Sequence, residues 1–296
     1  MDNASSAARD PVNKAFQILA RIADGPNTDL GVREIASALD LAPATTHRLL
    51  TVLEANGLVR RTPQGKYQLG LEIMRLSWLI STRFSLVEAA RPPLEELVRE
   101  CNETALLGLY DANRGKMMFA LAVESDHPLR YVIRLHEWVP IYAAASGLAI
   151  FAFLPESERR AVLQSAELKP LTVKTMLDPA QIEEQAAYVR KRGYAISHGQ
   201  RLDGAVGIAA PVWGHDGRVV GDVVLTLPEQ RFLDTSEDAL VQGVVAAASK
   251  LSAQLTHDLP PGGARIQPGP SQSSQSSSGA TNGVDAGSSR VFADSG

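Results

Sequence analysis

Polar side chains that could read DNA gather on one predicted helix near the N-terminus. Residues 41–61 read LAPATTHRLLTVLEANGLVRR, in which leucines recur at helical spacing while another face carries Thr, His and Arg. A hydrophobic core needs the leucines but not the polar face. Arginine can bond guanine or phosphate in a bidentate manner, and threonine can hydrogen-bond a base while its methyl group touches thymine. The chemistry expected of this segment is therefore recognition of a DNA groove.

The candidate DNA contacts lie on this helix and on the segment that follows it. Thr45, Arg48 and Val52 share one helical face, at positions i, i+3 and i+7. The predicted contacts are Thr45, Thr46, His47, Arg48, Thr51, Arg60, Arg61 and Lys66. The cations among them outnumber Glu54, the one acidic residue of this stretch, so the local charge is positive. A solvated helix, or one used only for protein contacts, is the alternative.

Local signals predict a winged helix-turn-helix domain over residues 9–70 that would position these side chains. Asp10-Pro11 starts a helix as N-cap and first residue, and Gly25-Pro26-Asn27 ends it. Its expected inward face is Val12, Ala15, Phe16, Leu19, Ile22 and Ala23. A second helix is predicted near 32–39 and a third from Pro43 to about 55. Runs 58–61 and 66–69 then flank a Thr-Pro-Gln-Gly turn and predict a β-hairpin.

The rest of the chain predicts a linker helix and a larger α/β domain. Residues 71–81 are apolar and helical within a linker of 71–84, which suits either an ordinary core helix or packing between subunits. Residues 85–257 alternate helices and strands around a mostly antiparallel sheet, so the fold class is α+β overall. Predicted strands are 104–110, 117–123, 130–135, 194–197, 205–212 and 219–227; predicted helices are 87–100 (interrupted early by Arg91-Pro92-Pro93), 146–153, 156–166, 179–192 and 236–255. Residues 1–8 and the Gly/Ser/Gln-rich 258–296 are expected to be disordered.

Composition restricts the class of protein. The chain has 296 residues, 45% of them hydrophobic, which is enough for two domains. It has no charge-free apolar run long enough to span a membrane, no secretory signal and only Cys101, so we expect a cytoplasmic protein without disulfides or a thiolate metal site. No cofactor is expected. A net charge of −4 argues against wholesale coating of nucleic acid but says nothing about a local basic patch.

Two other functions compete with DNA binding. An enzyme would need a catalytic constellation, and the sequence has no H-E-x-x-H, G-x-S-x-G or phosphate-loop pattern. We therefore expect no catalytic residues. A small-molecule-sensing interaction module without an operator of its own is the second alternative, and it would show no salt-dependent affinity for DNA.

The chain resembles the IclR family of bacterial transcriptional regulators over about residues 12–255. The resemblance rests on co-linear blocks, among them VREIASALDLAPATTHRLLTVLEANGLV, KYQLGLEIMRLS, PIYAAASGLAIFAFLP and VRKRGYAISHGQRLDGAVGIAAPVW. It implies a homodimer or homotetramer on a roughly palindromic operator, acting as repressor or activator. It also implies a GAF/profilin-like C-terminal domain that binds an effector, often an organic or aromatic acid.

The resemblance also implies an effector site on the sheet of that domain. Carried over by position, its candidates are Ala145, Ser146, Gly147, Ser197, His198, Gly207 and Thr226. A glycine-containing turn that opens a helix offers free N–H groups to a carboxylate, and Ser197 and Thr226 supply hydroxyls.

This chain departs from the family pattern at three places. Leu148 stands where members often have lysine, Gln200-Arg201 where many have acidic residues, and Gly207 where many have Cys or Ser. Gln and Arg in place of carboxylates favour an anionic ligand. A glycine at 207 would enlarge the pocket, which suggests a bulkier, aromatic effector.

Overall fold

The computed structural model describes residues 10–24, 29–81, 85–165 and 168–257. The predicted disordered ends, 1–8 and 258–296, lie outside the described residues, as do residues 82–84 of the predicted linker. None of the described helices combines the length and hydropathy that crossing a membrane requires.

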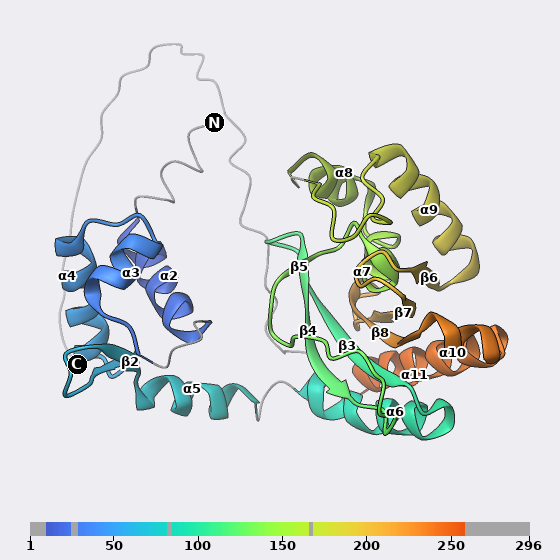
Figure 1. The fold of residues 1–296 in the computed structure, drawn as a ribbon, viewed down its shortest axis with the longest axis horizontal. Coiled ribbons are helices and arrows are strands. Elements are labelled where there is room, and N and C mark those ends of the chain that lie inside the picture. Colours follow the sequence, from blue (N-terminus) through green and yellow to red (C-terminus); the bar gives the residue numbers. More distant parts are fainter. Residues whose placement is uncertain (1–9, 25–28, 82–84, 166–167, 258–296) are drawn as a thin grey trace, which may run out of the picture. The chain divides into compact units, whose positions relative to one another are not determined.

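The N-terminal module has the predicted order of three helices and a hairpin (Figure 1). Its elements are α2 Pro11–Ala23, α3 Val32–Ala38, α4 Pro43–Ala55, β1 Val59–Arg61 and β2 Tyr67–Leu69. The Asp10 carboxylate accepts a 2.9 Å hydrogen bond from the Val12 N–H, so the predicted cap forms. In the hairpin, Val59 pairs with Leu69, and Leu30 and Tyr67 exchange backbone hydrogen bonds of 2.8 and 2.9 Å.

The inward face of α2 is the predicted one only in part, since Ile22 is buried and Ala15 and Leu19 pack against the core as expected. Ile18 and Ile22 are the buried residues of this helix, whereas Val12 is 61% and Phe16 is 67% exposed. The helix carries two adjacent apolar stripes, and the pattern alone does not say which of them faces the core. The core of the module uses the Ile18–Ile22 stripe, against side chains such as Leu50 of α4.

Helix α5 spans Leu71–Ser81, as predicted. It begins right after the hairpin, and an ion pair between Arg75 and Glu72 lies along it. Much of its apolar surface is exposed in the single chain, with Leu71 77% and Ile80 51% exposed.

The C-terminal domain is built on one antiparallel sheet of six strands, in the order β5-β4-β3-β8-β7-β6. The strands are β3 Thr104–Asp111, β4 Lys116–Val123, β5 Val139–Pro140, β6 Ala195–His198, β7 Ala205–Trp213 and β8 Val219–Pro228. The helices are α6 Ser85–Cys101, α7 Ala144–Phe151, α8 Glu156–Ser165, α9 Pro179–Arg192, α10 Glu229–Asp234 and α11 Glu237–His257.

Helices cover both faces of this sheet (Figure 1). On one face α6 and α11 pack against alternate residues such as Leu107 and Leu225. On the other face α7 packs against the intervening residues, such as Leu106 and Val224, and α9 packs against α7. Successive side chains of a strand point to opposite faces of the sheet, so each strand contributes side chains to two separate hydrophobic cores. The predicted α/β architecture with a mostly antiparallel sheet is confirmed.

Two predicted elements differ from the structure, and two of its short elements, β5 and α10, were not predicted. The prolines Pro92 and Pro93 do not interrupt α6, which runs through them. A proline inside a helix costs a hydrogen bond and favours a kink, but Ala90 and Leu94 on either side are buried in the core and hold the helix in place. Residues 130–135 form no strand, since the edge of β4 pairs only with the short β5.

Candidate nucleic-acid interface and ligand pocket

Helix α4 presents the polar face that the sequence predicted. Leu49, Leu50 and Leu53 point into the core of the module. His47, Arg48 and Thr51 are exposed, and Thr45 is partly exposed. Val52, on the Thr45–Arg48 face, is 55% exposed. In a helix-turn-helix such a face lies in the major groove, so these side chains suit contact with base edges and phosphates.

Thr46 does not belong to this face. Its side chain is 0% exposed, and its hydroxyl donates a 3.2 Å hydrogen bond to the Ala42 carbonyl one turn earlier. A short polar side chain can be buried in a helix when the preceding turn accepts its hydrogen bond. Thr46 therefore supports the helix from inside and is removed from the candidate DNA contacts.

The cationic side chains of the hairpin differ in how far neighbouring groups already balance their charges. Arg60 and Arg61 are exposed, although the Arg61 guanidinium lies 5.9 Å from the centre of the Tyr67 ring. Lys66 forms a 3.2 Å ion pair with Asp29, so part of its charge is already balanced. Of the hairpin cations, Arg60 and Arg61 are better placed than Lys66 to meet phosphates.

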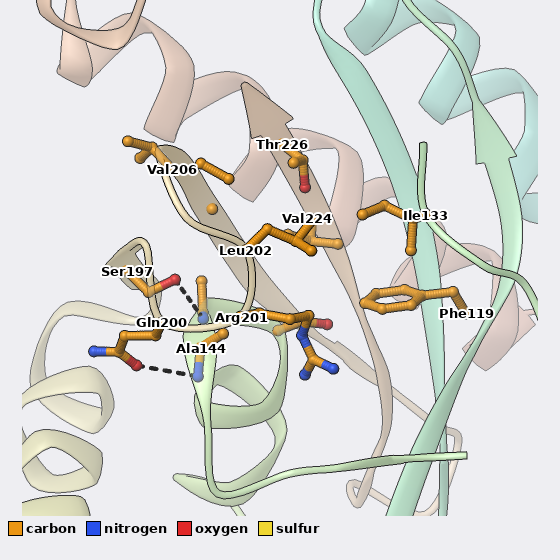
Figure 2. Close-up of a pocket in the computed structure, with 14 residues that line it drawn as sticks. Phe119, Ile133, Ala144, Ser197, Gln200, Arg201, Leu202, Val206, Val224 and Thr226 are labelled. Atoms are coloured by element: carbon orange, nitrogen blue, oxygen red, sulfur yellow. Dashed lines mark hydrogen bonds between the residues drawn. The ribbon is translucent and has the colours of Figure 1, made fainter. Parts of the chain in front are cut away.

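A small pocket opens between α7 and the sheet of the C-terminal domain (Figure 2). The volume of the pocket is about 40 Å³, counted as the space that the centre of a water molecule can occupy. The pocket is lined by Phe119, Ile133, Ala144, Ala145, Ser146, Ser197, Gln200, Arg201, Leu202, Ala205, Val206, Gly207, Val224 and Thr226. Most of these side chains are apolar, with a few polar groups converging, which is the composition of a small-molecule site.

Five of the seven predicted effector residues line this pocket, and two do not. Ala145, Ser146, Ser197, Gly207 and Thr226 do so. Gly147 instead packs on the backbone of Ile141, where an added Cβ would lie 2.7 Å from the carbonyl oxygen. His198 is exposed, with Nδ1 3.5 Å from a carboxylate oxygen of Glu229. Successive side chains of a strand point to opposite faces of the sheet, so the side chain of His198 points away from the pocket because that of its neighbour Ser197 points toward it.

The start of α7 is capped by one side chain of β6 and one of the β6–β7 connection (Figure 2). Gln200 Oε1 accepts a 3.1 Å hydrogen bond from the Ala144 N–H, and Ser197 Oγ accepts a 2.9 Å hydrogen bond from the Ala145 N–H. The expectation of free N–H groups at this helix start is wrong for these two. Ala144 itself has a φ of 64°, a strained conformation for a residue with a Cβ.

Arg201 brings a cation to the pocket wall. Its Nη2 lies 3.4 Å from the Ala143 carbonyl oxygen and 3.5 Å from that of Pro140, both long for hydrogen bonds. Its guanidinium lies 5.6 Å from the centre of the Phe119 ring. Burial lowers the pKa of Arg201, and the charge of Asp222 partly opposes this.

Beneath the pocket lies a buried carboxyl group, Asp222 of β8. Its Oδ2 accepts a 2.5 Å hydrogen bond from the Ser146 hydroxyl, while Oδ1 has no hydrogen-bond partner among the described residues. Burial raises the pKa of Asp222 to about 7, against the opposing effects of the Ser146 hydrogen bond and the Arg201 charge. This carboxyl group therefore carries a full negative charge only above neutral pH.

Sequence reasoning missed most of the apolar wall. Phe119, Ile133, Leu202 and Val224 come from segments far apart in the chain. Nothing local distinguishes them from ordinary core residues. The sequence did point to Arg201, because this cation stands where many family members carry acidic residues.

Family comparisons agree with both parts of this structure. Residues 11–63 match the family model described as "IclR helix-turn-helix domain", and residues 80–253 match "Bacterial transcriptional regulator IclR C-terminal". The chain belongs to the IclR family. It is an IclR-type DNA-binding transcriptional regulator, and the related proteins are named as regulators rather than as enzymes, as the sequence led us to expect.

Similar proteins include a named regulator and two solved IclR structures. The chain is 31% identical over 242 residues to the HTH-type transcriptional regulator BhcR of Paracoccus denitrificans, covering 81% of this chain and 85% of BhcR. A putative IclR regulator from Silicibacter sp. TM1040 superposes with a TM-score of 0.74 at 26% identity, covering 85% of this chain and 98% of that one. An IclR homologue of Microbacterium hydrocarbonoxydans, solved with 4-hydroxybenzoate, shares the fold with a TM-score of 0.71 at 22% identity, covering 83% and 99%.

Proposed function

We propose that this IclR-family regulator binds a roughly palindromic operator through α4 and the β1–β2 hairpin. The observation that carries the proposal is the exposed face of Thr45, Arg48 and Val52 on α4, with Arg60 and Arg61 on the neighbouring hairpin. The helix face would read base edges, and the hairpin cations would hold the phosphate backbone. Because bacterial DNA lies in the cytoplasm, the protein would act there.

A palindromic operator calls for at least two copies of the chain. Exposed apolar side chains support a homo-oligomer, since Val12 and Phe16 on α2 and Leu71, Met74 and Ile80 on α5 leave water-exposed stripes in the single chain. Burying such stripes against a second copy would bring two recognition helices to two half-sites. Light scattering should give a mass of at least two chains; a monomer at micromolar concentration would contradict this arrangement.

The pocket between α7 and the sheet is the proposed effector site. Its apolar wall and its cation, Arg201, suit an organic acid, and the Microbacterium relative was solved with an aromatic acid. An effector can shift the protein between DNA-binding and non-binding arrangements only if it binds one of them more tightly. Repression or activation would then depend on where the operator lies relative to the promoter.

Selection of DNA by the full chain tests the operator proposal. The protein is used to enrich duplexes from a random-sequence pool, and the affinity of an enriched duplex is then measured between 50 and 200 mM salt, a range over which DNA-binding proteins lose affinity steeply. The proposal predicts enrichment of a two-fold symmetric motif and a steep fall in affinity with salt. A scrambled duplex of equal composition is the control. Equal affinity for both duplexes would favour an interaction module without an operator.

A further inference from the structure

Two polar residues of the β1–β2 hairpin lie directly opposite each other on its outer face. Arg60 of β1 pairs with Gln68 of β2. Their neighbours Val59 and Tyr67 are only 1% and 2% exposed, and side chains alternate between the two faces along a strand. Arg60 and Gln68 therefore project from the face of the hairpin that is turned away from the core of the module.

The amide of Gln68 holds the guanidinium of Arg60 by one edge. Its oxygen accepts a hydrogen bond of 2.7 Å from Nε and another of 2.7 Å from Nη2 of Arg60. The oxygen must be the atom that faces Arg60, because the amide nitrogen is itself a donor and would meet two N–H groups without an acceptor. The guanidinium is thereby held in one orientation before any partner arrives.

The other edge of this guanidinium can bind a partner. Arginine has five N–H donors, and Gln68 takes the one on Nε and one of the two on Nη2. In the part of the chain that the structure describes, no group hydrogen-bonds Nη1. The edge formed by Nη1 and Nη2 keeps parallel N–H groups, whose geometry matches two oxygens of a phosphate.

An uncharged partner leaves the positive charge of Arg60 intact. Lys66 of the same hairpin pairs with the carboxylate of Asp29, which balances part of its charge. Gln68 orients Arg60 without adding a negative charge that would repel DNA. A long side chain that is ordered only on binding weakens the affinity, so a cation that is already oriented binds its phosphate more tightly.

We propose that Gln68 is a positioning residue for DNA binding, which fixes Arg60 so that the remaining edge of its guanidinium meets a backbone phosphate. This role rests on the phosphate contact proposed for the hairpin. It gives Gln68 no contact with a base. Because phosphate contacts carry no sequence information, the contribution of Gln68 to affinity should be the same on any duplex.

A double-mutant cycle on the full chain tests this role. Fluorescence anisotropy gives the affinities of Gln68→Leu, Arg60→Ala and the double variant for an enriched duplex and for a scrambled one. Each affinity is measured at several salt concentrations, and the salt slope is the slope of log affinity against log salt concentration.

The two single variants should differ in their salt slopes. Gln68→Leu should bind both duplexes at least about threefold more weakly with an unchanged salt slope, because the charge of Arg60 stays and only its ordering is lost. Arg60→Ala should reduce the salt slope by about one for each copy bound. Adding Gln68→Leu to Arg60→Ala should weaken binding no further, since Gln68 then has no cation to position.

A matched substitution elsewhere in the module controls for the loss of an amide. Gln17→Leu, at an exposed position of α2, should leave DNA affinity unchanged. If Gln68→Leu fails to fold, Gln68→Thr takes its place in the cycle. Threonine suits a strand, and its hydroxyl is too short to reach the guanidinium of Arg60.

Three results would overturn the positioning role. They are an unchanged affinity in Gln68→Leu, a loss that persists in the Arg60→Ala background, and an unchanged salt slope in Arg60→Ala. The scrambled duplex keeps this test separate from the proposed operator. Equal affinity of the unaltered chain for both duplexes would count against the operator alone. A failed cycle beside a clear preference for the enriched duplex would overturn the role of Gln68 alone.

Discussion

The hydroxyl of Ser146, at the start of α7, donates a 2.5 Å hydrogen bond to Oδ2 of Asp222 on β8. This contact joins the helix that borders the pocket to the central sheet at a fully buried position. Gly108 on the adjacent strand makes room for the carboxyl group, since a Cβ there would lie 2.0 Å from Asp222 Oδ1. The pocket therefore stands directly above an ionisable group of the core.

Asp222 should make the stability of the protein depend on pH. Its folded-state pKa of about 7 lies above the ordinary value of 3.8, so the folded protein holds this proton more tightly than the unfolded chain does. The resulting stabilisation is complete below pH 3.8 and is lost as the pH rises to about 7.

Urea denaturation at pH 5 and pH 8 measures this effect. From pH 5 to pH 8 the free energy of unfolding should fall by roughly 2–3 kcal/mol more in the unaltered chain than in Asp222→Asn. Asp216→Asn, at an exposed turn, is the control and should behave like the unaltered chain. The same pH dependence in all three proteins would show that Asp222 is not the titrating group.

Thr45 and Thr46 offer a matched pair of substitutions on adjacent residues. Thr45→Val should weaken binding to an enriched duplex several-fold, because it removes a hydroxyl from the groove-facing side of α4. Thr46→Val should leave DNA affinity unchanged and alter the free energy of unfolding by only about 1 kcal/mol, because the lost hydrogen bond to Ala42 is internal. Fluorescence anisotropy and urea denaturation measure the two effects. Equal losses of DNA affinity in both variants would return Thr46 to the interface.

Residues from Pro260 onward should be dispensable for folding and for DNA binding. Their composition, rich in Gly, Ser and Gln, provides little apolar area to bury. A chain ending at Leu259 should keep the melting temperature and the DNA affinity of the full chain. A drop of several degrees in melting temperature would mean that this segment packs against the rest of the protein.

Features with local causes were predictable from the sequence. Asp10 and Asp178 both cap helices that begin with proline, and Gly193 ends α9 in the left-handed conformation with a φ of 84°. These signals depend on a few neighbouring residues, so the helices were found with small errors at their ends. The β3–β4 and β7–β8 hairpins were equally accessible because turn residues separate two apolar runs.

Features with tertiary causes were not predictable in the same way. Whether Phe16 or Ile18 faces the core depends on which stripe of α2 meets α4, and both stripes are apolar. The burial of Thr46 follows from the packing of three helices rather than from its own type. Residues 130–135 have strand-like composition but lack a partner strand in register, which only the fold reveals.

The central claim is that α4 reads DNA, and Arg48 tests it most directly. The affinity of Arg48→Ala for an enriched duplex is compared by anisotropy with that of Arg218→Ala, which removes the same charge from the C-terminal domain. Loss of a bidentate base contact should cost roughly 1–3 kcal/mol of binding free energy in Arg48→Ala and relax the preference at one base pair, with no such loss in Arg218→Ala. Unchanged affinity and unchanged sequence preference in Arg48→Ala would contradict the claim.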